Sequence, residues 1–285
     1  MGARAAGALT AAFSAERRGL LAHAYRMLGA YHEAEDVVQD TYLRALRGWE
    51  GFEERSSVRT WLYRIATNAC LNVLDSRRRS EVSGLVLEPF PTDPADLVTA
   101  RESVRLAFVA GLQHLAPRQR AVLLLREVLA FSAAETGETL GMSVPAVKSA
   151  LQRARARLAE AAPARDGVLD ASSPRAQQLL ASYMAAWEAS DAEAFREVLR
   201  ADASIEPLGA ARVYTGREEC LAFATPSMEG PGSWRMQATE ANGQPAVVAW
   251  FRGEPFGVAV LTVAADGILM ITLFGDPKLA DVFSR

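Results

Sequence analysis

The chain has 285 residues, of which 50% are hydrophobic and 23% are charged, and its formal net charge at pH 7 is -3. Two cysteines, 20 glycines and 13 prolines do not supply the composition of a disulfide scaffold, a collagen or a disordered protein. No apolar run approaches the roughly 18 residues that a membrane helix needs, and the N-terminus has no continuous apolar signal core. We therefore expect a soluble, cytoplasmic protein without a membrane partner, and its length favours more than one domain.

Charge is divided unevenly along the chain. Residues 1–160 carry 21 basic and 18 acidic residues, a net charge of +3, whereas residues 161–285 carry 10 and 16, a net charge of -6. Basic residues gather at 77–79 and at 148–157, and the second stretch contains no acid. Local patches of this kind predict contact with a polyanion.

Helical periodicity dominates the first part of the chain. The predicted helices lie near 14–29, 31–47 and 57–76, then at about 100–113, after Pro117, at 132–140 and at 144–160. Three prolines and several acids between residues 80 and 98 predict a connector. We therefore expect two helical domains, at 13–80 and 101–160, joined by a linker at 81–100.

A second linker is expected at 161–174, where the sequence is small, polar and bounded by proline. Beyond it, helical patterns at 175–189 and 191–200 precede strand-like runs with hairpin turns at Asn242-Gly243 and Asp266-Gly267. Those runs lie at 203–208, 233–241, 245–252, 256–264 and 268–274. The expected fold is multidomain, with two all-α domains followed by an α+β domain at 175–285.

Residues 131–158 carry the sharpest motif. Ser132 is placed to cap a short helix, Gly141 to end it, and Ser143 to cap the next helix, with Pro145 in its first turn. This layout is typical of a helix-turn-helix. Leu140, Val144, Val147 and Leu151 are expected to pack inward, and the outward face has the side chains with which proteins bind DNA. An ordinary helical hairpin with a solvated basic face remains the alternative.

Two further helices carry mixed polar faces. In residues 34–46, a stripe at helical spacing combines acidic, amide and apolar side chains; it is either a solvated face or a surface for a protein partner. In residues 56–79, basic and amide residues share the side opposite Trp61, which suits an opened DNA strand. A soluble helix over a core tryptophan would look the same.

These segments resemble, in order and spacing, the extracytoplasmic-function class of bacterial sigma factors over about residues 13–160. The residues that carry the resemblance are HEAEDVVQDT at 32–41, VRTWLYRIATN at 58–68, LAPRQR at 115–120 and the helix-turn-helix. The resemblance implies that the first domain docks on the clamp helices of the largest subunit of the RNA polymerase core and opens the minus-ten element. The second domain would read the minus-thirty-five element of promoter DNA.

The resemblance also assigns roles to individual residues. It implies polymerase contacts by four residues of the 34–46 stripe: Asp36, Gln39, Asp40 and Leu43. It implies minus-ten contacts by Arg64, Asn68, Arg77, Arg78 and Arg79, with a flipped base held in the loop between Trp49 and Ser57. It implies upstream contacts by Lys148, Ser149, Gln152, Arg153 and Arg155, with Arg153 as a base reader.

Residues 175–283 resemble the SnoaL-like, ketosteroid-isomerase-like domain that ends some sigma factors of this class. The resemblance rests on LASYMAAW at 180–187, ANGQPA at 241–246 and FGDPKL at 274–279. It implies a cone-shaped sheet whose cavity could hold a small-molecule ligand and be lined by Trp187, Trp250, Phe256 and Phe274, although such aromatic residues more often form a plain core.

We do not expect an enzyme, a cofactor or a metal site. Related enzymes use a pocket Asp or His as general acid or base, and residues 161–285 contain no His. Cys70 and Cys220 lie too far apart in sequence to form a CxxC pair. The leading hypothesis is a sigma factor that its C-terminal domain regulates in cis. The alternative is a SnoaL-like enzyme or ligand-binding domain fused to a DNA-binding repressor module.

Overall fold

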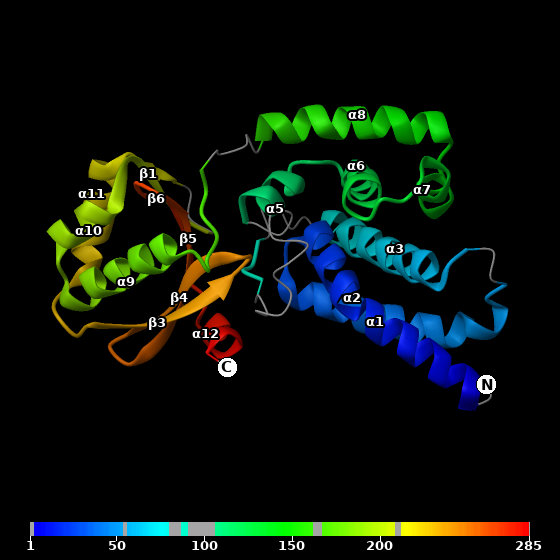
Figure 1. Ribbon diagram of the computed structural model, residues 1–285, viewed down its shortest axis with the longest axis horizontal. Coiled ribbons are helices and arrows are strands. Elements are labelled where there is room, and N and C mark those ends of the chain that lie inside the picture. The colour runs from blue at the N-terminus through cyan, green and yellow to red at the C-terminus, as the bar shows by residue number, and fades with distance from the viewer. Residues whose placement is uncertain are drawn as a thin grey trace. The chain divides into compact units, whose positions relative to one another are not determined.

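The computed structural model (Figure 1) divides the chain into two compact units. One comprises Met1–Glu88 and Leu106–Ala164, and the other Pro89–Arg105 and Arg165–Arg285. The residues described are 3–53, 56–79, 87–90, 106–161, 167–208 and 212–284. The predicted linker at 81–100 lies outside this set except for residues 87–90, as do residues 162–166 of the linker predicted at 161–174.

The first unit contains the predicted helices, with one longer than expected. Its elements are α1 (Ala3–Leu28), α2 (Tyr31–Gly48), a short 3-10 turn (Trp49–Gly51), α3 (Val58–Arg79), α5 (Leu106–Gln113), α6 (Pro117–Leu123), a π-helical turn (Leu124–Val128), α7 (Ala133–Leu140) and α8 (Val144–Ala161). Helix α1 starts well before the predicted residue 14. Alanine-rich sequence favours helix there, and Leu9 and Phe13 bury their side chains, with Phe13 packing 4.8 Å from the Tyr42 ring.

The two predicted helical domains form one compact unit. Helix α1 packs on α2 and α3, and it also contacts α5 and α6; helix α3 contacts α6 and α7. Its core is apolar, with fully buried Leu20, Leu28, Leu62 and Leu124. Burial of these side chains drives the packing of the helices, so separating the two halves would expose apolar surface.

The second unit is an α+β domain, as predicted. Its helices are α9 (Pro174–Ala189), α10 (Ala192–Val198), α11 (Arg217–Met228) and α12 (Pro277–Phe283), and its strands are β1 (Leu199–Pro207), β2 (Tyr214–Thr215), β3 (Trp234–Ala241), β4 (Gln244–Phe251), β5 (Glu254–Ala264) and β6 (Gly267–Phe274). The sheet order is β2-β1-β6-β5-β4-β3, with β1 and β6 parallel and the other neighbours antiparallel. Asn242 and Gly243 both have positive φ, at 57° and 67°, as the predicted hairpin turn requires.

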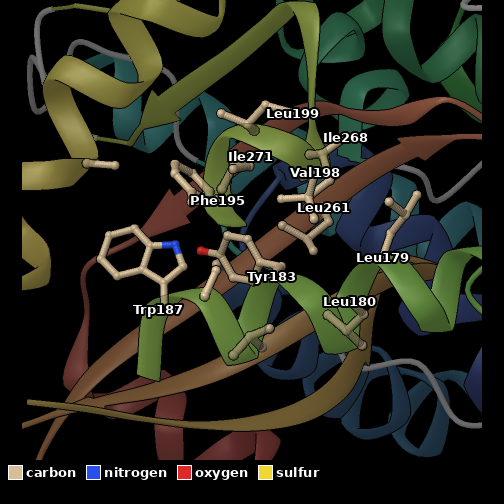
Figure 2. Close-up of a cluster of buried hydrophobic side chains, with 14 of the residues drawn as sticks. Leu179, Leu180, Tyr183, Trp187, Phe195, Val198, Leu199, Leu261, Ile268 and Ile271 are labelled. Carbon is tan, nitrogen blue, oxygen red and sulfur yellow. The ribbon is translucent and has the colours of Figure 1, made fainter. Parts of the chain in front are cut away.

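One face of this sheet packs against helices to form the core of the second unit. Figure 2 shows Tyr183 and Trp187 projecting from α9 toward Phe195, Leu261 and Ile271. The ring centres of Trp187 and Phe195 lie 5.8 Å apart, and those of Tyr183 and Phe195 lie 5.9 Å apart. The other face is also buried and contacts α12 through β4 and β5.

Candidate nucleic-acid interface

The turn between α7 and α8 has the predicted chemistry. Ser132 forms a capping box with Glu135: the Glu135 backbone N–H donates to the Ser132 hydroxyl at 3.1 Å, and the Ser132 N–H donates to the Glu135 carboxylate at 2.8 Å. Gly141 ends α7 with φ of 63°. A Cβ on Gly137 would lie 2.5 Å from the Met142 carbonyl oxygen, so the turn passes too close to α7 for any side chain there. The local geometry is that of a helix-turn-helix.

Helix α8 presents a polar face to solvent. Val147, Ala150, Leu151 and Ala154 are buried, whereas the five predicted upstream contacts, Lys148, Ser149, Gln152, Arg153 and Arg155, are all exposed. Val144, which we expected to pack inward, is the first residue of α8 and is 39% exposed.

The exposed face of α8 divides into a centre and two edges. Successive helical residues are rotated by about 100°, which places Ser149 and Gln152 at the centre. Lys148 and Arg155 lie along one edge, and Arg153 lies along the other. The Arg155 guanidinium donates to the Glu127 carboxylate on the π-helical turn at 2.6 Å, and Arg153 donates to the Ser149 hydroxyl.

The five predicted minus-ten residues on α3 lie in different environments. Arg64 pairs with Glu138 of α7 at 3.1 Å, and the Asn68 amide donates to the Arg64 carbonyl at 3.0 Å. Arg78 and Arg79 are exposed at the end of the helix. This exposed end leaves two of the three consecutive arginines open to a phosphate backbone.

Arg77 is committed to the protein interior, so its predicted place on a DNA-binding face is corrected. Its side chain is only 15% exposed. Its Nη1 donates to the Leu28 carbonyl at 2.9 Å, and its Nε and Nη2 donate to the Glu33 carboxylate. A guanidinium at the C-terminal end of α1 satisfies a carbonyl that has no partner within the helix.

The end of α1 is also bound by the second helical segment. Arg120 on α6 is 3% exposed, and it donates to the Met27 carbonyl and to the Gln113 and Leu115 carbonyls. Burial lowers the pKa of Arg120 to about 10, with a smaller contribution from the charge of Arg77. This side chain therefore remains a cation near neutral pH and serves structure.

His23 lies in the interior between α1 and α3. It is 1% exposed, and its Nε2 lies 2.9 Å from the Thr67 hydroxyl. Burial, together with the positive charge of Arg26, lowers the pKa of His23 to about 3. The ring is therefore neutral in the folded protein at physiological pH.

The acidic stripe of α2 borders a shallow groove. Val37, Val38 and Ala45 face inward, whereas Asp36, Gln39 and Leu43 are exposed and Asp40 is half-buried beside Arg44 at 2.7 Å. The Leu43 side chain is 49% exposed, an unusual state for a large apolar residue. A groove of about 390 Å³ runs from Asp36 and Asp40 to α3.

An aromatic cluster that the sequence did not reveal lies where the flipped base was expected. Trp49 and Phe52 stack with ring centres 5.5 Å apart and an interplanar angle of 15°, and both contact Trp61 at 5.9 and 4.9 Å. Both rings remain partly exposed. Stacked aromatic rings are suitable surfaces for an unpaired base. Glu54 and Arg55 of the same loop lie outside the described residues.

The aromatic residues predicted to line one cavity do not share one. Trp187 belongs to the buried core. Trp250 and Phe274 lie on the opposite face of the sheet, where Arg235 stacks 3.6 Å from the Trp250 ring centre and Phe274 pairs with Val258. Phe256 is 41% exposed and touches Trp234 at 5.0 Å. The error arose because both faces of β4 are buried, so hydrophobicity did not reveal which face each residue occupies.

Within the ranges that the structure covers, no three His, Cys, Asp or Glu side chains converge as metal ligands would. Among those same residues, no helix combines the length and apolar character needed to cross a membrane.

Comparisons with known proteins agree with the geometry. Residues 12–80 match the Sigma-70 region 2 family, and residues 105–158 match Sigma-70, region 4. The ECF RNA polymerase sigma factor SigG of Mycobacterium tuberculosis is 44% identical over 94% of this chain and 81% of its own length. SigJ of the same organism is 29% identical over 92% of this chain and 86% of its own length.

A crystal structure shows the fold over nearly the whole chain. That of Mycobacterium tuberculosis SigJ matches with a TM-score of 0.68 and 24% identity, covering 94% of this chain and 97% of its own. The predicted order of helical segments followed by an α+β domain is confirmed.

Proposed function

The chain belongs to the extracytoplasmic-function family of RNA polymerase sigma factors, which direct polymerase to specific promoters. We propose which of its residues contact polymerase and which contact each promoter element. Its Sigma-70 regions bind polymerase core and promoter DNA. The observation that carries the residue-level proposal is the capped helix-turn-helix, whose polar face is exposed.

The clamp helices of polymerase dock on the outward face of α2. Asp36, Gln39 and Leu43 are exposed, and Asp40 borders the same groove. An exposed leucine flanked by carboxylates suits a partner surface that is basic and partly apolar. Binding removes the leucine side chain from water, and the carboxylates favour a partner of opposite charge.

Binding of isolated core polymerase tests this surface. We expect Asp36→Arg and Leu43→Ala to lower core affinity at least tenfold without changing the melting temperature, since both side chains are exposed. Glu254→Arg makes the same charge change at an exposed site in the second unit and serves as the control. Wild-type core binding by Asp36→Arg would refute the docking face.

Minus-ten DNA meets the exposed end and outer side of α3. Arg78 and Arg79 neutralise phosphates, while Arg64 and Asn68 face the opened strand. The rings of Trp49 and Phe52 receive an unstacked base, since a flipped base needs a π surface and a partly protected site.

The recognition helix reads bases from its centre and binds phosphates from its edges. Gln152 and Ser149 point directly away from the buried side of α8, so they approach base edges. The basic side chains at the edges of the helix are placed to meet the phosphates on the two walls of the DNA groove. Lys148 and Arg155 lie on one edge, and Arg153 lies on the other. This assignment changes Arg153 from a base reader to a phosphate contact.

Two single variants separate these roles. Gln152→Ala should cost about 1–3 kcal/mol on the cognate upstream element and little on random duplex, because a base contact is lost. Lys148→Ala should weaken both duplexes equally and reduce the slope of log K against log salt by about 0.9. If Gln152→Ala weakens both duplexes alike, Gln152 does not read a base.

The C-terminal unit modulates the sigma factor in cis through the connector. In the helical unit, Glu88 donates its backbone N–H to the Gly29 carbonyl at 2.8 Å. Two residues later, in the second unit, the Phe90 N–H donates to the Asn242 side chain at 2.9 Å and the Asn242 N–H donates to the Phe90 carbonyl at 2.9 Å. The connector is therefore hydrogen-bonded within each unit on either side of Pro89, which supports it as the route of the regulation.

Transcription in vitro tests this regulation. Asn242→Gly keeps the positive φ of the turn but removes the side-chain acceptor for Phe90. We expect the variant with core polymerase to change promoter output at least threefold relative to wild type. Gly243→Asn alters the same turn without removing that acceptor and is the control. Equal output from wild type and Asn242→Gly would remove the connector from the regulatory pathway.

A further inference from the structure

Strand β3 forms one edge of the sheet in the second unit. Within the described residues it pairs with β4 and with no strand on its other side. It is eight residues long, whereas β2 at the opposite edge has two. An open edge strand is a template for pairing with another chain, and proteins usually shorten, charge or cover such strands. What covers β3 therefore decides whether this edge can pair.

The hairpin between β3 and β4 determines which backbone groups of β3 point outward. Its two-residue turn at 242–243 makes Ala241 and Gln244 a hydrogen-bonded pair. Bonded and non-bonded pairs alternate along an antiparallel ladder. Ala238 and Met236 therefore belong to non-bonded pairs, and their N–H and C=O groups point away from β4 toward the open edge.

Helix α9 covers one of these outward positions and leaves the next one open. The Met236 N–H donates to the Glu188 carboxylate of α9 at 2.8 Å, so this side chain takes the place of a neighbouring strand. Two residues further along, Ala238 is exposed. Its outward N–H and C=O form no hydrogen bond with any residue that the structure describes. The edge therefore offers a free donor and a free acceptor at Ala238.

The open position lies in a groove between α9 and β3, which are neighbours in Figure 1. The groove has a volume of about 700 Å³, a size typical of ligand sites. Leu180 and Met184 of α9 line its apolar side, and Ala238 lines it from the strand. Successive side chains of a strand point to opposite faces. A chain paired with Ala238 would therefore direct every second side chain toward α9.

The charge of the groove favours a basic occupant. Its described lining includes the carboxylates of Glu188 and Glu240 and contains no lysine, arginine or histidine. The bond from Met236 uses only Oε1 of Glu188, which leaves Oε2 for a further donor. A basic side chain opposite Met236 would lie within reach of that oxygen, and opposite charges across an interface select the partner.

A second copy of this chain fits the edge less well than a basic segment does. Two-fold pairing of β3 about Ala238 would set Glu240 of each copy opposite Met236 of the other. The Met236 N–H already donates to Glu188, so that bond of the new ladder could not form. The pairing would also bring carboxylates of the two copies together, and like charges across a strand pair are destabilising.

We propose that the open edge of β3 binds an extended, basic segment of another polypeptide as an additional strand. Main-chain bonds to Ala238 contribute affinity, and alternate side chains of the segment determine specificity. The segment places a basic residue within reach of Glu188 and, two positions along, an apolar residue against Leu180 and Met184. Neither polymerase nor promoter DNA takes part in this binding.

A synthetic peptide added to the full chain tests the proposal. The probe is a fluorescein-labelled heptapeptide, Thr-Lys-Thr-Leu-Thr-Lys-Thr, whose symmetry suits either strand direction. One control peptide has glutamate in place of both lysines, and the other has an N-methyl group on the leucine amide, which removes the main-chain donor. We expect fluorescence anisotropy to show that both controls bind at least tenfold more weakly. Equal binding of all three peptides, or no binding of the probe at millimolar concentration, would overturn the proposal.

Variants of the full chain locate the bound peptide. Ala238→Pro removes the outward N–H without removing a bond to β4, a position at which edge strands accept proline, and should weaken the probe at least tenfold. Ala238→Ser keeps the N–H and should bind like the wild type. Glu188→Gln keeps an oxygen for the Met236 N–H but removes the charge, so it should weaken the probe at least threefold.

Melting temperatures of the three variants show whether each one folds, and Glu188→Gln tests the site if Ala238→Pro does not. Wild-type binding by folded Ala238→Pro, or by Glu188→Gln, would place the peptide elsewhere and refute the proposal. Sedimentation of the wild type without peptide tests the other occupant. Self-association that Ala238→Pro abolishes would assign the edge to a second copy of the chain instead.

Discussion

The consecutive arginines at the end of α3 allow a structural residue to be separated from DNA contacts. Arg77→Ala removes one bond to the Leu28 carbonyl and two to Glu33. Hydrogen bonds to charged groups contribute about 1.5–3 kcal/mol each, and a cation at a helix C-terminus adds about 0.3–1 kcal/mol. Because Glu33 regains part of its hydration, being 39% exposed, we expect the free energy of unfolding to fall by about 3 kcal/mol. Urea unfolding followed by circular dichroism measures this loss.

The neighbouring arginine supplies the control. Arg78 is 82% exposed and lies 3.7 Å from Asp75, so Arg78→Ala should change the unfolding free energy by less than about 0.5 kcal/mol while weakening binding to minus-ten DNA. Arg77→Lys should recover only part of the stability, since one ammonium group cannot bridge the carboxylate and the carbonyl as a guanidinium does. Equal stability losses for Arg77→Ala and Arg78→Ala would refute the distinction.

Three further outcomes follow from the same structure. The pKa of His23 is about 3 in the folded chain and about 6.5 in the unfolded chain, so its contribution to stability is complete above pH 6.5 and is lost as the pH falls. Between pH 7 and 5, the unfolding free energy of the wild type should therefore fall by about 2 kcal/mol more than that of His23→Gln in urea titrations. Parallel pH profiles for the two proteins would contradict the buried neutral ring. Ser132→Ala removes the α7 cap and should cost about 1 kcal/mol in thermal unfolding, whereas an unchanged melting temperature would show that the cap contributes nothing. Gly257→Ala would bring a Cβ to 1.9 Å from the Phe274 carbonyl oxygen and should lower unfolding free energy by more than about 3 kcal/mol; a wild-type value would disprove that close approach.

Local chemistry made the helix-turn-helix predictable from sequence. Its caps involve residues three or four positions apart, such as Ser132 with Glu135, and this spacing is visible without a structure. Helix α11 was not predicted because Pro226 interrupts its pattern near the end. The parallel pairing of β1 with β6 joins distant parts of the chain, and hydrophobic periodicity contains no information about such a pairing.

The role of Arg77 was missed although part of the signal lay in the sequence. Cys70 is fully buried on α3, and position 77 is seven residues later, on the same side of the helix. That spacing distinguishes Arg77 from Arg78 and Arg79. Arg77 is bound by the end of α1 and by Glu33, which come together only in the folded unit. The sequence therefore indicated that Arg77 faces inward but not which groups bind it.

The distribution of arginine partners also bears on how DNA affinity will respond to salt. Arg64 and Arg155 each hold an acid of the same unit in a partly exposed pair, and salt screens such pairs as it screens contacts with phosphate. Added salt therefore weakens the competitor together with the DNA contact. The net number of salt cations released when the protein binds DNA is then smaller than the number of basic residues that touch the DNA backbone. The slope of log K against log salt should be shallower than a count of those residues predicts, and it should steepen when Glu127 or Glu138 is neutralised.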